Sequence, residues 1–155
     1  MFNVSQQEAR RYFASVWQNR HHKNLDAQQK KVLAIIIEHP EYQSVLENIE
    51  QYLDYQWLPE EGQNNPFLHM SLHLSLLEQY SINQPEGISV IYQALLEKNQ
   101  NTHLTEHVMM DALTEMIWQA QRYSNGFDVN LYITLLREKL DLPPENHPRL
   151  NPHEI

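Results

Sequence analysis

Two histidines four residues apart, His69 and His73, have the spacing of a metal-binding pair on a helix. The segment 65–79 opens with Asn65 and Pro66, which are typical of a helix cap and a first turn. At about 100° per residue, the two imidazoles point about 40° apart, toward the apolar side of this helix. Imidazoles on an apolar face need hydrogen-bond partners, a shared metal ion, or both.

A second pair, His103 and His107, lies on a long helix that the sequence predicts from Asn101 to about residue 123. The helical wheel places Glu106 inside the apolar face of this helix, with the two histidines at its edge. A buried carboxylate without a partner costs several kcal/mol or takes up a proton. Glu106 therefore requires a cation or a hydrogen-bond donor.

The two predicted helices together offer the donors of a metal site. Residues four apart share a helix face and can both reach one ion at about 2.0–2.1 Å, and helical bundles build such sites from facing helices. We expect a divalent metal, with zinc, iron and manganese all compatible with mixed imidazole and carboxylate ligands. The candidate ligands are His69, His73, Glu106, His107 and His103.

The string His103-x-x-Glu106-His107 also matches the inverted zincin pattern of peptidases. A peptidase is disfavoured because little helical chain remains to supply a third ligand and a large cleft. Glu106 is a candidate general base if a metal is bound, and the catalytic residues are otherwise unknown. Whether the protein is an enzyme stays open.

Two other interpretations compete with a site for a divalent metal ion. In the first, the protein is a metal-free interaction or structural module whose histidines form a polar network in the core. In the second, the inward-facing groups line a pocket for haem or another small ligand. The remaining helical-region histidines, His21, His22 and His39, are expected at the surface or in turns.

Composition limits the class of protein. The chain has 155 residues, no Cys and a net charge of −9. The lack of Cys excludes disulfides and thiolate metal sites and favours a cytoplasmic location. The acidic balance disfavours nucleic acid as a partner, and no apolar run is long enough for a membrane helix. A protein partner or a second copy of the chain stays possible.

Helix signals dominate the chain, with caps at Ser5, Asp26 and Asn101 and further helices predicted over residues 41–54, 88–98 and 128–140. We predict an all-α, single-domain helical bundle of six or seven helices over residues 1–141. Residues 142–155 are rich in proline and are predicted to be a disordered tail.

Several short motifs point to a known family. They are Glu38-His39-Pro40-Glu41-Tyr42, Asn65-Pro66-Phe67-Leu68-His69 with His73, and Glu106-His107-x-Met109-Met110 followed by Trp118-x-Ala120-Gln121-Arg122. Over roughly residues 1–140 the chain resembles a family of short bacterial proteins catalogued as a domain of unknown function. That resemblance implies a bacterial, cytoplasmic protein and carries no assigned activity.

Overall fold

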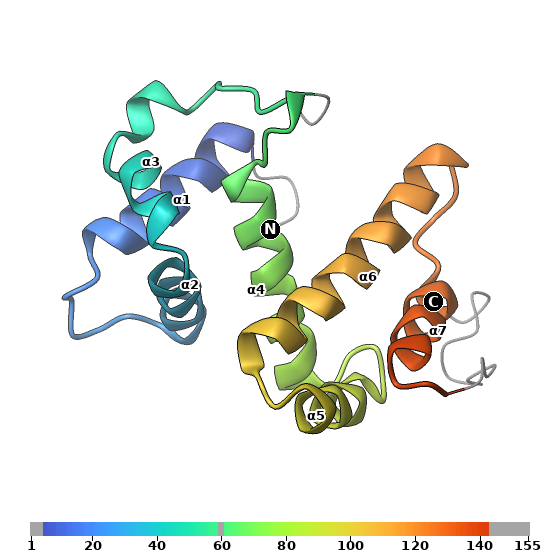
Figure 1. Ribbon diagram of the computed structural model, residues 1–155. Coiled ribbons are helices and arrows are strands. Elements are labelled where there is room, and N and C mark those ends of the chain that lie inside the picture. The colour runs from blue at the N-terminus through green and yellow to red at the C-terminus, as the bar shows by residue number, and fades with distance from the viewer. Residues whose placement is uncertain (1–4, 59–60, 143–155) are drawn as a thin grey trace. The chain divides into compact units, whose positions relative to one another are not determined.

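The computed structural model describes residues 5–58 and 61–142 (Figure 1). These residues form seven α-helices and two short 3-10 helices, with no strand among them. The predicted all-α class and the predicted number of helices are confirmed. The predicted disordered tail lies, apart from Leu142, outside the described residues. No helix in the described ranges combines the length and the apolar character needed to cross a membrane.

The chain forms two compact units that divide between Leu74 and Ser75. The first unit contains helix α1 and the elements that follow it in the chain as far as Leu74 (Figure 1). Its elements are α1 (Gln6–Gln18), α2 (Ala27–Glu38), η1 (Pro40–Tyr42), α3 (Gln43–Glu47), η2 (Ile49–Gln51) and the first part of α4 (Pro66–Ile82).

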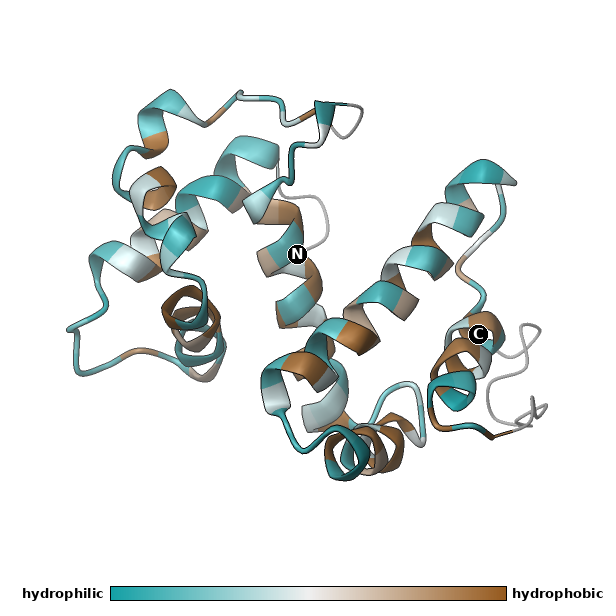
Figure 2. Cartoon of the chain, in the orientation of Figure 1, coloured by the Kyte–Doolittle hydropathy of each residue, from teal (hydrophilic) through white to brown (hydrophobic). Residues whose placement is uncertain are grey.

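Caps and apolar spacing explain the first two helices. Ser5 accepts a hydrogen bond from the backbone N–H of Glu8, and Asp26 forms a reciprocal capping box with Gln29. The apolar run of α2 appears as a brown segment in Figure 2. Buried apolar side chains of α1, α2, α3 and α4 form the core of the unit, and they include Phe13, Val16, Val32, Ile35, Ile36, Leu46 and Met70.

The helix predicted over residues 41–54 is instead broken into η1, α3 and η2. The break follows from Asn48, whose backbone leaves the helical region at φ −118° and ψ 38°. Its side-chain amide donates to the carbonyl of Ser44 at 2.8 Å, which satisfies a carbonyl at the helix end. An Asn side chain that bonds the backbone carbonyl four residues earlier in this way ends α3 after five residues.

Arg10 ties α1 to the segment that follows η2. Its Nη1 donates to the backbone carbonyls of Tyr52, Leu53 and Tyr55 at 2.6, 3.2 and 2.9 Å. The Arg10 side chain is buried, and this burial lowers the pKa of its guanidinium. A buried charge is tolerated here because three carbonyl dipoles converge on it.

The guanidinium of Arg10 also packs against aromatic rings that lead toward α4. Its central carbon lies 5.1 Å from the ring centroids of both Trp57 and Phe67. Phe67 stands in the first turn of α4, where Asn65 caps the helix by accepting from the backbone N–H of Phe67 and of Leu68. Arg10 therefore helps to position the beginning of the helix that carries His69 and His73.

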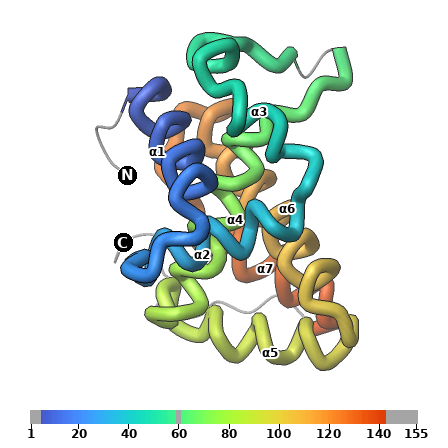
Figure 3. Tube along the Cα trace, turned by 90° about the vertical axis from the view of Figure 1, so that its left-hand side faces the viewer, coloured from blue at the N-terminus to red at the C-terminus, as the bar shows by residue number. Residues whose placement is uncertain are grey.

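The second unit contains the rest of α4, α5 (Ile88–Asn99), α6 (Thr102–Arg122) and α7 (Val129–Lys139). Helix α6 contacts both α5 and α7, and the three helices can be followed in Figure 3. Asn101 and Asp128 cap α6 and α7 by accepting from the backbone N–H groups of Leu104 and Leu131. The core of this unit includes Ile88, Leu95, Met109, Met110, Leu113, Ile133 and Leu136.

Replacement of Arg10 by Ala should destabilise the protein by about 2–4 kcal/mol, because buried carbonyls lose their charged donor. Arg11→Ala is the matched control, since Arg11 forms an exposed ion pair with Glu50 and should cost far less. Urea unfolding followed by circular dichroism measures both. Equal losses for the two variants would contradict the role given to Arg10.

Candidate metal site

The site is built around His39, which follows the last residue of α2. His39 caps that helix with φ −126° and ψ 71°, and Pro40 then starts η1. The chain therefore turns sharply here, because proline cannot continue the helical hydrogen bonding of α2. His39 occupies a turn as predicted, but its side chain is only 4% exposed, so the alternative expectation of a surface residue is wrong.

A hydrogen bond to the backbone fixes the His39 ring. Its Nδ1 lies 2.8 Å from the carbonyl oxygen of Ile35. A carbonyl can only accept, so Nδ1 carries the proton and the neutral ring keeps its lone pair on Nε2. Metal-binding histidines are commonly held in this way, with one ring nitrogen bonded to a carbonyl and the other presented to the ion.

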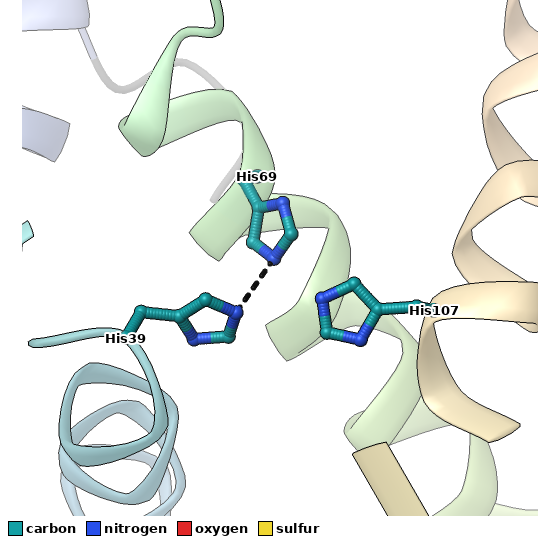
Figure 4. A group of neighbouring side chains, drawn as sticks. All are labelled: His39, His69 and His107. Carbon is teal, nitrogen blue, oxygen red and sulfur yellow. Dashed lines mark hydrogen bonds between the residues drawn. The ribbon is translucent and has the colours of Figure 1, made fainter. Parts of the chain in front are cut away.

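The Nε2 atom of His39 faces a histidine of α4. The Nε2 atoms of His39 and His69 are 3.1 Å apart, and the rings point toward one another (Figure 4). Because His39 Nε2 is the acceptor, the Nε2–H of His69 donates. Figure 4 also labels His107, which belongs to the second unit.

His73 completes a set of three imidazoles within the first unit. The ring centroids of His39, His69 and His73 are separated by 4.6 Å, 5.7 Å and 6.0 Å. His73 is fully buried, whereas His69 is half-buried one helical turn earlier. The i, i+4 spacing of α4 therefore brings both predicted histidines beside His39, with the His69 ring nearer to it than the His73 ring.

Glu38 brings a carboxylate to the same group. Ligand atoms of Glu38, His39 and His73 all lie within 4.8 Å of one another. The carboxylate Oε2 of Glu38 is 4.0 Å from Nε2 of His73, and the Glu38 side chain is 39% exposed. The group therefore has a buried imidazole side and a carboxylate side that water reaches.

Tyr42 forms one wall of the group. Its ring stacks on His39 with a centroid distance of 5.1 Å and an interplanar angle of 4°. Burial, assisted by the charge of Glu41, raises the pKa of the Tyr42 hydroxyl, which therefore stays neutral at ordinary pH. Tyr42 supplies a flat apolar surface that holds the His39 ring and excludes water from one of its faces.

The other predicted ligands belong to the second unit. Glu106 is buried as expected, and the donor that its carboxylate requires is the hydroxyl of Tyr92 on α5, at 2.5 Å from Oε2. His103 is exposed, and Nδ1 of His107 bonds to the His103 carbonyl at 2.7 Å. The convergence of these residues with His69 and His73 stays a prediction, because the two sets belong to different units.

Glu38 and His39 are the members of the group that we did not predict as ligands. His39 has no histidine or carboxylate partner on its own helix face, so a helical-wheel analysis gives it no role. The motif Glu38-His39-Pro40-Glu41-Tyr42 is the one sequence signal that includes them. It contains the carboxylate, the imidazole, the helix-ending proline and the stacking tyrosine in five consecutive residues.

Residues 5–138 match the model of a protein family described as a domain of unknown function (DUF1841). The chain belongs to this family. The matched range includes Glu38, His39, His69 and His73. A comparison with curated proteins finds no match, and a comparison with solved structures finds none either.

The buried pair of Tyr92 and Glu106 should stabilise the second unit. Tyr92→Phe removes a hydrogen bond to a carboxylate and should cost about 1.5–3 kcal/mol. Tyr132→Phe is the matched control, because Tyr132 is also buried and donates to the neutral amide of Gln79, a bond worth about 1 kcal/mol. Chemical denaturation measures both. A Tyr92 variant no less stable than the Tyr132 variant would show that Glu106 is not held as a carboxylate.

Proposed function

We propose that this protein binds one divalent transition-metal ion through the imidazoles of His39, His69 and His73. The observation that carries the proposal is the 3.1 Å separation between the Nε2 atoms of His39 and His69. Two nitrogens bound to one tetrahedral ion at about 2.0–2.1 Å lie about 3.3 Å apart. The pair therefore needs to open by only a few tenths of an ångström to admit an ion.

The donor set favours metals that accept neutral nitrogen ligands. Three imidazoles with a neighbouring carboxylate suit zinc, and iron or manganese also accept such mixed ligation. The chain contains no Cys, so a thiolate contributes nothing to the selection. Selectivity among these metals then depends on coordination geometry and on their availability, since intrinsic affinity follows the Irving–Williams order.

Metal binding requires one change of protonation within the group. The proton that His69 donates to His39 in the metal-free state must leave Nε2, and the neutral ring can carry it on Nδ1 instead. The Nδ1–H of His39 stays on the Ile35 carbonyl throughout. Since each ligand must be a neutral imidazole, acidification competes with the metal and lowers its affinity.

A metal-free polar network is the second candidate. The direct bond between His69 and His39 supports it, because that bond pairs one ring nitrogen of each histidine without an ion. In this alternative the histidines specify the packing of α4 against the end of α2. The two candidates differ in what zinc does to the protein, and a binding measurement separates them.

Zinc titration of the chelator-treated full chain should show one ion bound per chain by isothermal calorimetry and by elemental analysis. His39→Ala and His73→Ala should each weaken binding at least about 100-fold, since each removes a ligand. His22→Ala is the matched control, because His22 is an exposed histidine outside the group and its loss should leave affinity unchanged.

Replacement of a buried histidine can also disturb folding, so circular dichroism of each metal-free variant accompanies the titration. His69→Gln, at a half-buried position, provides a milder variant with the same expected loss of zinc. If the wild-type chain takes up no stoichiometric metal, and the variants only lower the melting temperature, the polar network is the correct interpretation.

A further inference from the structure

The position of Glu38 indicates whether the proposed metal site is open or closed at its fourth ligand position. Resting on the metal site proposed above, we infer that Glu38 does not bind the ion directly but holds a water molecule at an open fourth position. The ion then has three imidazole ligands from the protein and one exchangeable ligand from solvent. This arrangement is typical of catalytic zinc sites, whereas structural sites close the fourth position with a protein ligand.

The carboxylate of Glu38 lies farther from His73 than a second ligand of the same ion would lie. Oε2 of Glu38 lies 4.0 Å from Nε2 of His73, whereas two ligands of one tetrahedral ion lie about 3.3 Å apart. The imidazole pair of His39 and His69, at 3.1 Å, already has a separation near that value. A water on the same ion would lie about 3.3 Å from Nε2 of His73, so a carboxylate oxygen 4.0 Å from that nitrogen can be within hydrogen-bond reach of the water. The carboxylate is therefore placed to accept a hydrogen bond from a water on the ion.

The members of the group also differ in burial. His73 is 0% exposed and His39 is 4% exposed, so these two imidazoles are shielded from solvent. Glu38 is 39% exposed and stands at the end of α2, so its carboxylate borders the side of the group that water reaches. A small ligand from solvent would therefore approach the ion past Glu38.

The chemistry follows from this placement. A divalent ion makes its bound water more acidic, and a nearby carboxylate can orient that water and accept its proton. Small anions and other oxygen or nitrogen donors of similar size can displace the water. The negative charge of Glu38 opposes an incoming anion, because like charges about 4 Å apart repel by one to a few kcal/mol near a protein surface.

Cobalt(II) and azide provide the test, because the visible spectrum of cobalt reports both metal binding and a change of its ligands. The chelator-treated full chain is loaded with Co²⁺ and titrated with sodium azide. We expect one Co²⁺ per chain and a saturable spectral change with azide. Glu38→Gln should still bind one Co²⁺, with an affinity within about tenfold of wild type, and should bind azide several-fold more tightly.

Glu41→Gln is the matched control, because it removes the same charge from an exposed residue three positions away and should leave azide binding near the wild-type value. If Co²⁺ binds and azide has no effect, the fourth position is closed and this inference is wrong, while the proposed metal site stands. If Glu38→Gln weakens Co²⁺ as severely as His73→Ala does, Glu38 is a direct ligand. If wild type binds no Co²⁺, the proposed metal site fails as well.

Discussion

The hydrogen bond between Nδ1 of His39 and the carbonyl of Ile35 is the constraint on which the candidate site depends. It selects one tautomer of a buried imidazole and thereby directs the lone pair of Nε2 toward His69. The carbonyl is available because α2 ends at Glu38 and leaves its last carbonyl groups without helical donors. One helix end therefore supplies both the ligand and the group that orients it.

The rest of the first unit holds this arrangement in place. Pro40 prevents α2 from continuing, and Tyr42 stacks on the His39 ring once the chain has turned. On the other side, Arg10 fixes the segment that leads into α4, and α4 then presents His69 and His73 one turn apart. A buried imidazole is costly without a partner, and the bonds of His39 to the Ile35 carbonyl and to His69 meet that requirement for both of its ring nitrogens.

Local signals in the sequence were sufficient to predict most of the fold. The caps at Ser5, Asp26 and Asn101 each mark a helix start in the structure, because a cap acts within one turn of its own helix. The same local reasoning failed over residues 41–54. There the competition between helix formation and the side-chain bond of Asn48 to the backbone decides the outcome, and apolar spacing does not report it.

The candidate site was less predictable, because its residues meet through tertiary contacts. The spacing of His69 and His73 is visible within one helix, and so is the inward direction of Glu106. The partners of these residues lie elsewhere in the chain: His39 faces His69, and Tyr92 donates to Glu106. Periodicity identifies groups that need partners, but it does not identify the partners, which depend on how helices pack.

X-ray absorption at the zinc edge of the zinc-loaded full chain measures most directly whether His39, His69 and His73 share one ion. We expect a four-coordinate ion with three imidazole nitrogens at about 2.0–2.1 Å and the multiple scattering typical of histidine rings. An oxygen-only shell, or a shell with a single imidazole, would show that His39, His69 and His73 do not share an ion.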